Sequence, residues 1–172
     1  MNKIKLPKHS GLIISHNQHK YSGMSINDYV TDYDYTGDDF EYNECIKHDS
    51  IWEMTWYPDT PIGCYDIYSS TFEGLFEDLD EYDTINLEMK ESTMDKIKHL
   101  DCGLRITHNE FKLNYISIEE YLETLQRTSK YHLKIDNCIE NDSIWKMECY
   151  SDIQPKRYSN TFEGLFEHII KK

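Results

Sequence analysis

The sequence predicts an α+β protein made of two copies of one β-α-β-β-β-α unit, each an antiparallel sheet covered by two helices. Two observations predict this class. Short segments recur in the same order along the 172 residues, and each copy alternates between the period of strands and the period of helices. The expected organisation is an N-terminal unit (residues 1–83), a linker (84–102) and a C-terminal unit (103–172).

Four pairs of segments carry the repetition. GLIISHN at 11–17 matches GLRITHN at 103–109, and SINDYV at 25–30 matches SIEEYL at 117–122. DSIWEM at 49–54 matches DSIWKM at 142–147, and TFEGLFE at 71–77 is identical to 161–167. Because the order is kept and the offset stays between 90 and 93 residues, the pattern predicts a tandem duplication.

The first elements of the unit follow from the spacing of apolar residues. Leu12, Ile14 and His16 share one face of a first strand. A helix begins at Ser25, with Asp28 at the third position of a capping box, and Ser117 begins its counterpart.

Three further strands and a last helix are expected after this helix. A second strand is expected around Phe40–Ile46, and a third over 52–56 places alternate residues on one face. A turn at 58–63 then allows a fourth strand over 64–69. The last helix begins near Ser70 or Thr71 and buries an apolar face. Within the linker, Ser92 and Asp95 allow a short helix.

The net charge is distributed very unevenly between the units. The whole chain carries −14, whereas residues 11–90 alone hold 18 acidic and three basic side chains, a net charge of −15. Residues 91–172 hold 14 acidic and 12 basic side chains, a net charge of −2. This balance disfavours direct binding to nucleic acid or to an anionic membrane, and favours a basic or nucleic-acid-binding protein as partner.

The acidic residues of the N-terminal unit gather in two runs interspersed with tyrosines. A solvated face without a partner would explain such runs, but the difference between two otherwise similar units favours a contact surface that imitates a phosphate backbone. The expected partner-contacting residues are Asp28, Tyr29, Asp32, Asp34, Asp38, Asp39, Glu41, Glu77, Asp78, Asp80 and Glu81.

The sequence also repeats a His-Asn pair, His16-Asn17 and His108-Asn109. These pairs suggest either a duplicated general base or histidines that bond backbone at the edge of the sheet, and we favour the second interpretation because no nucleophile recurs at a matching place. A zinc site built from His16, His19, Cys45 and His48 is disfavoured because Phe111 and Asn141 replace two of the four in the C-terminal unit. No cofactor-binding fingerprint is present.

The function expected from these features is that of a non-enzymatic inhibitor encoded by a phage or mobile element. Its acidic unit would block the nucleic-acid-binding surface of a host defence nuclease, in the manner of an anti-CRISPR or anti-restriction DNA mimic. The C-terminal unit would serve self-association as a homodimer or a second contact. An immunity protein covering the cationic active site of a toxin, or a small enzyme using the His-Asn pairs, are the alternatives. We expect a cytoplasmic protein, because no signal peptide or apolar membrane span is visible.

Overall fold

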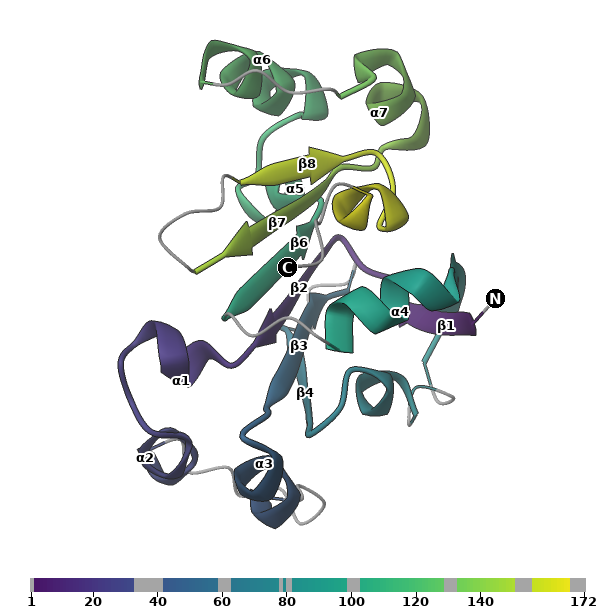
Figure 1. Ribbon diagram of the computed structural model, residues 1–172. Coiled ribbons are helices and arrows are strands. Elements are labelled where there is room, and N and C mark those ends of the chain that lie inside the picture. Colours follow the sequence, from purple (N-terminus) through teal and green to yellow (C-terminus); the bar gives the residue numbers. More distant parts are fainter. Residues whose placement is uncertain are drawn as a thin grey trace.

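The computed structural model describes residues 2–32, 42–58, 63–77, 79, 82–98, 103–128, 133–150 and 156–167. Within these residues the chain is a mixed α+β protein whose centre is a six-stranded antiparallel sheet in the order β4-β3-β2-β6-β7-β8 (Figure 1). The strands are β2 (Gly11–His16), β3 (Trp52–Tyr57), β4 (Tyr65–Ser69), β6 (Leu104–His108), β7 (Trp145–Cys149) and β8 (Arg157–Ser159). The sheet therefore runs continuously through both units.

The two central strands pair symmetrically. In the β2–β6 ladder, Leu12 faces His108, Ile14 faces Ile106 and His16 faces Leu104. Leu12 thus faces the residue that corresponds to His16 in the repeat, and His16 faces the residue that corresponds to Leu12. Ile14 faces Ile106, which is the residue that corresponds to Ile14 itself. The register consequently has a local two-fold centre at the Ile14–Ile106 pair, and the two units meet there.

One face of this sheet carries the main hydrophobic core. Leu12, Ile14, Trp52, Ile106 and Trp145 point into it. A two-stranded antiparallel sheet, made of β1 (Asn2–Pro7) and β5 (Thr84–Met89), covers this core. Three short helices complete the cover: α4 (Glu91–Lys98) and the 3₁₀ helices η1 (Glu73–Phe76) and η3 (Glu163–Phe166). The segment 84–102 therefore contributes β5 and α4 to the core.

Helices α2 (Ile26–Asp32) and α3 (Tyr42–His48) lie beyond one edge of the six-stranded sheet, and α6 (Ile118–Thr128) and α7 (Ile135–Asn141) lie beyond the other (Figure 1). The short helices α1 (Gln18–Tyr21) and α5 (Glu110–Leu113) follow the central strands β2 and β6. Helices α2 and α3 pack with Ile51 in one small cluster, and α6 and α7 pack with Ile144 in another. None of the helices in the described residues has the length and apolar character needed to cross a bilayer.

Several sequence predictions are confirmed. The strands predicted over 52–56 and 64–69 are β3 and β4, and the first strand is β2. The helix predicted from Ser25 is α2, where Ser25 Oγ accepts the backbone N–H of Asp28 at 3.1 Å. Ser117 caps Glu120 at the same distance at the start of α6.

The strand predicted around Phe40–Ile46 is wrong, because its described part is helix α3. Cys45 is fully buried whereas its neighbour Ile46 is 38% exposed, so of residues 43–46, whose side chains the structure describes, Cys45 enters the apolar cluster. Glu44 pairs with Lys47 and His48 at the three- and four-residue spacings of a helix. In the C-terminal unit, α7 likewise replaces the expected strand.

The predicted coverage of the sheet by two helices in each unit is also wrong. The TFEGLFE segments form single 3₁₀ turns, although Phe72, Leu75, Phe162 and Leu165 are buried as expected. Helices α2 and α6 bury their apolar faces against α3 and α7, because the core face of the sheet is already covered by β1, β5 and α4.

Candidate functional site

The repeated His-Asn pairs lie where β2 and β6 end and α1 and α5 begin. Asn17 and Asn109 both adopt a left-handed backbone conformation, with φ of 50° and 54°. Asparagine tolerates this conformation better than most residues. The chain therefore turns sharply from strand to helix directly after each histidine.

Each asparagine side chain fastens this turn to a neighbouring one. Asn17 Nδ2 donates to the carbonyl of Asp49 at 3.1 Å, and Asn17 Oδ1 accepts from Ile51 N at 2.9 Å. Asn109 makes the same two bonds to Asp142 and Ile144, both at 2.9 Å. The two asparagines therefore satisfy backbone groups inside the protein and have a structural role.

The histidines are buried between an indole ring and a serine hydroxyl. His16 stacks on Trp52 with ring centroids 4.1 Å apart, and His108 stacks on Trp145 at the same separation. His16 Nε2 lies 3.2 Å from Ser50 Oγ, and Ser50 Oγ lies 3.0 Å from the carbonyl of Ser70. His108 has the matching contact to Ser143 at 3.0 Å.

These distances fix the direction of the hydrogen bonds around His16. The Ser70 carbonyl only accepts, so the single hydroxyl proton of Ser50 goes to it, and His16 Nε2–H donates to Ser50 Oγ. A histidine acting as general base must instead accept the proton of its nucleophile. The Ser-His contact is therefore oriented against nucleophilic catalysis.

Burial keeps both histidines neutral. Burial, then the charges of Lys20 and His19, lower the pKa of His16 to about 4. Burial, then His9 and Lys112, lower the pKa of His108 to about 3. The expectation that these histidines bond backbone at the edge of the sheet is wrong, because β2 and β6 are central and the partners are serines.

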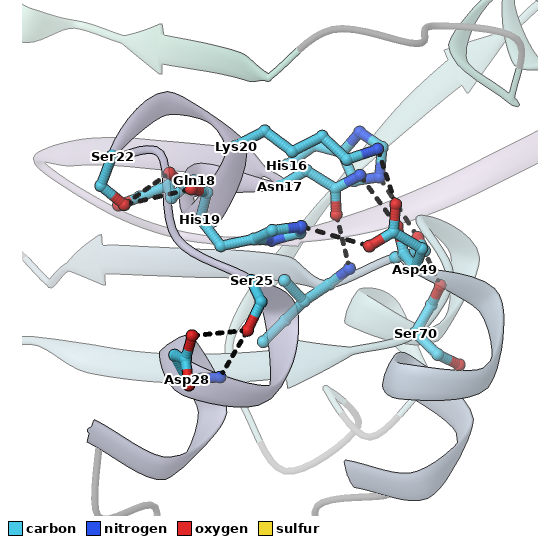
Figure 2. Close-up of polar contacts among 12 residues, drawn as sticks. His16, Asn17, Gln18, His19, Lys20, Ser22, Ser25, Asp28, Asp49 and Ser70 are labelled. Carbon is cyan, nitrogen blue, oxygen red and sulfur yellow. Dashed lines mark hydrogen bonds and ion pairs between the residues drawn. The ribbon is translucent and has the colours of Figure 1, made fainter.

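A cleft of about 390 Å³ opens beside His16. Two ion pairs cross its rim, Lys20 to Asp49 at 2.9 Å and Lys98 to Glu73 at 2.8 Å. Figure 2 shows Lys20, His19 and Asp49 converging in front of the His16-Asn17 turn. Because each lysine is already neutralised by a carboxylate, the cleft offers no net charge to a small ionic ligand.

His19 distinguishes this site from its counterpart. Its side chain is 2% exposed, and its Nε2 lies 3.3 Å from Asp49 Oδ1. Burial lowers the pKa of His19, while Asp49 opposes that shift. Phe111 occupies the matching position in the C-terminal unit. Among the described side chains, no group of three or more His, Cys, Asp or Glu residues is placed to hold a metal ion.

The structure places only part of the expected acidic contact set. Asp28 is exposed on α2, and Glu77 is exposed directly after η1. Asp32 belongs to α2, but its side chain is outside the described set. The residues that lie outside the described part of the chain are Asp34, Asp38, Asp39, Glu41, Asp78, Asp80 and Glu81.

Tyr29 does not fit the role expected for it. It is 3% exposed, and its hydroxyl donates to Glu53 Oε1 at 2.6 Å. The helical pattern of the sequence had already placed Tyr29 on the apolar face of α2, and this signal outweighs its position beside the acidic run. Tyr29 is a core residue and supplies no contact area.

The cations of the N-terminal unit pair with acids of the same chain. Lys20 and Lys47 pair with Asp49 and Glu44, and Lys8 pairs with Asp83. The exposed carboxylates Asp28 and Glu77 are outside these pairs. Asp28 and Glu77 therefore keep exposed negative charge on the described part of this unit.

Sequence reasoning missed the serines that contact the histidines. Ser50 and Ser143 are part of the repeated Asp-Ser-Ile-Trp segment, so a recurring hydroxyl was visible. It was overlooked because 34 residues separate Ser50 from His16, and only the pairing of β2 with β3 brings them together.

Comparison with known proteins finds no relative of this chain. The chain matches no protein-family model, and neither a curated protein nor a solved structure shows significant similarity to it.

Proposed function

We propose that this chain is an inhibitor that binds a basic, nucleic-acid-binding protein through the acidic surface of its N-terminal unit. The observation that supports it best is the charge difference between the units, −15 over residues 11–90 against −2 over residues 91–172. Dense like charge destabilises a compact fold, so an acidic surface confined to one unit is more readily explained by a cationic partner than by the fold itself.

The most specific form of the proposal is a phage- or mobile-element-encoded protein that occupies the nucleic-acid-binding surface of a host nuclease in the cytoplasm. Carboxylates spaced along a folded scaffold would compete with phosphates and associate rapidly and in a salt-sensitive way. An immunity protein that covers a toxin nuclease uses the same chemistry and differs only in the partner.

We further propose that the two units arose by tandem duplication and that the acidic surface was acquired by one copy. The repeated segments support this origin, as do the matching Asn17 and Asn109 bonds and the symmetric β2–β6 register. Self-association through the C-terminal unit is part of the same proposal, since that unit carries little net charge to oppose it.

The enzymatic alternative has less support. The His-Asn pairs hold backbone turns together, and the Ser-His contact has the wrong direction for a general base. An inhibitor that acts by binding does not require a reactive His-Asn pair.

A DNA-cleavage assay with matched variants tests the proposal. The assay uses purified DNA-cleaving enzymes, a restriction endonuclease and a CRISPR effector nuclease. Neutralising Asp28→Asn with Glu77→Gln should weaken inhibition by roughly threefold to tenfold, because two exposed carboxylates are lost. Neutralising the matching Glu120→Gln with Glu167→Gln should leave inhibition within about twofold.

The Asn and Gln substitutions keep the hydrogen-bond acceptors, so the fold is preserved; Asp28→Asn still accepts the hydroxyl of Ser25. Raising NaCl from about 50 to 300 mM should weaken inhibition steeply if exposed charges carry the contact. Equal effects of the two double variants, or inhibition that is indifferent to salt, would contradict the proposal.

A further inference from the structure

The buried histidines of the two units differ in what faces their second ring nitrogen. In the C-terminal unit, Ser143 Oγ lies 3.4 Å from the carbonyl of Asn160, which only accepts, so His108 Nε2–H donates to Ser143 and leaves its Nδ1 as an acceptor. His9 Nε2 lies 3.4 Å from that Nδ1, and the two rings meet edge to face with centroids 5.0 Å apart. The imidazole of His9 therefore completes the hydrogen-bond chain of His108.

The same chain is incomplete at His16. Its Nε2–H donates to Ser50, so its Nδ1 is again the acceptor. His16 is 7% exposed, and its Nδ1 has no hydrogen-bond partner among the described residues. The residue that corresponds to His9 is Asp101, which lies outside the described part of the chain and whose carboxylate has no proton to donate at neutral pH. A buried acceptor without a donor costs free energy, so this position favours a donor from outside the chain.

The cleft of about 390 Å³ is lined by this same histidine. Trp52, Phe72 and Ile97 also line it, and their buried apolar side chains form its floor. The two lysine–carboxylate pairs at its rim leave it without net charge. The cleft therefore suits a flat, uncharged ring with a polar edge, since an aromatic ring gains from an apolar floor and a charged one finds no opposite charge to pair with.

We propose that this cleft binds an uncharged nitrogen heterocycle of the imidazole type, whose ring N–H donates to His16 Nδ1. The ligand takes the place that His9 holds beside His108 in the other unit. Burial, then the charges of Lys20 and His19, hold the pKa of His16 at about 4, so Nδ1 is an unprotonated acceptor at neutral pH. This site is additional to the acidic contact surface proposed above and does not depend on it.

The rim must open for the ring to enter. Nδ1 of His16 is covered by neighbouring side chains, so the ring reaches it when a rim side chain moves aside. Lys20 lies beside His16 (Figure 2), and its ion pair with Asp49 is partly exposed, with side-chain exposures of 36% and 58%. Exposed pairs of this kind contribute little free energy, so the rim opens at low cost. Opening also offers a lysine and a carboxylate to polar substituents of the ligand.

Titration with imidazole, followed by NMR of isotope-labelled histidines at about pH 8.5, tests the proposal, because free imidazole is mostly uncharged there. Imidazole should shift the His16 Nδ1 resonance with a Kd on the order of 1–10 mM, as expected for so small a ligand. 4-Methylimidazole keeps the N–H and should bind within about threefold of imidazole. 1-Methylimidazole has the same size but no N–H, so it should bind about tenfold more weakly.

Matched variants of the two histidines locate the site, with the indole resonance of Trp52 as readout. His16→Phe keeps a ring on Trp52 and removes the acceptor, so imidazole should bind about tenfold more weakly. His108→Phe makes the same change outside the cleft and should leave imidazole binding within about twofold of the original. If His16→Phe does not fold, the two methylimidazoles still decide on the unaltered chain.

The correspondence with His9 has its own test. His9→Ala empties the place beside His108, so imidazole should gain a second site, detected at the His108 Nδ1 resonance. Adenine and N-acetylhistidine methylamide then distinguish the source of the ring. Tighter binding of adenine indicates a free heterocycle, and tighter binding of the histidine amide indicates a histidine side chain of a partner.

Three results would overturn the proposal. They are a His16 Nδ1 resonance that imidazole leaves unshifted at about 100 mM, equal binding of the two methylimidazoles, and undiminished binding by a folded His16→Phe variant. None of these results bears on the inhibition of nucleases, which is tested by the acidic variants described above.

Discussion

The N-terminal and C-terminal units share their buried frame and differ in the polar groups around it. Both stack a histidine on a tryptophan, and both use an asparagine to tie two backbone turns together. These contacts depend on precise geometry and buried hydrogen bonds, so few substitutions preserve them. The comparison separates residues that both units use in the same way from residues that only one unit uses.

The polar groups that differ change the charge of each unit. Lys146 in the C-terminal unit is buried and pairs with Glu110 at 3.0 Å and Glu148 at 3.2 Å. Glu53 occupies the matching position in the N-terminal unit and accepts from Tyr29. In the C-terminal unit a buried lysine thus pairs with the inner carboxylates, whereas in the N-terminal unit a carboxylate stands at the position of that lysine. The following experiments test how far this distinction extends.

The largest effect is expected from pH. The folded pKa values of His16 and His108, about 4 and about 3, lie below the unfolded value of 6.5, so the unfolded state binds protons first as pH falls. Stability present above pH 6.5 is therefore lost below it, down to about pH 4 for His16 and about pH 3 for His108. The loss is on the order of 3 kcal/mol for His16 and somewhat more for His108.

Urea unfolding measured between pH 7 and the acid limit of the fold checks this expectation. Carboxylates whose pKa is lowered, such as Asp49 and Glu148, also contribute to acid unfolding, so the comparison must be between variants. His16→Gln and His108→Gln should each flatten the pH dependence, the second more than the first. Unchanged slopes in both variants would show that the buried histidines do not control acid stability.

The next largest effect is expected at Lys146. Lys146→Met leaves Glu110 without its buried cation and Glu148 with the exposed Lys156 alone, which should lower the free energy of unfolding by about 2 to 3 kcal/mol. Glu53→Gln keeps an acceptor for Tyr29 and should cost less than about 1 kcal/mol. Urea midpoints of the two variants measure the difference in stability. Similar losses would mean that Lys146 and Glu53 contribute equally to the stability of their units.

The asparagines should behave alike, in contrast to Lys146 and Glu53. Asn17→Ala leaves Ile51 N and the Asp49 carbonyl without their partner, and Asn109→Ala does the same to Ile144 and Asp142. Each substitution should cost about 2 kcal/mol. Thermal unfolding of both variants tests the shared frame; a loss confined to one unit would contradict it.

The smallest effect is expected at the turn that follows α1, where Gly23 corresponds to Tyr115 of the C-terminal unit. Gly23→Tyr introduces a side chain at φ of 70°, with open space around it, and should destabilise the chain by about 1 kcal/mol. Calorimetry would detect the lowered Tm. An unchanged Tm would mean that the left-handed turn accepts a side chain without measurable strain at position 23 and, by correspondence, at Tyr115.

Much of the local structure could be predicted from sequence. Alternating apolar residues identified β2 and β3, the turn before residue 64 identified β4, and the serine caps identified the start of α2 and α6. These signals are local, because a strand or helix start depends on residues a few positions apart. The prediction at Phe40–Ile46 failed because a short segment fits the strand period and the helix period, and packing of Cys45 against α2 favoured helix α3.

The sequence by itself determined the repeated segments, the core faces of the strands and the unequal charge of the two units, since each of these is a property of neighbouring residues or of a sum over them. Tertiary structure alone decided that β2 and β6 pair around a two-fold centre, that Ser50 meets His16, and that Lys146 lies between Glu110 and Glu148. The physical reason is distance along the chain. Contacts between residues tens of positions apart depend on strand register and on which face is already covered, and no local pattern encodes either.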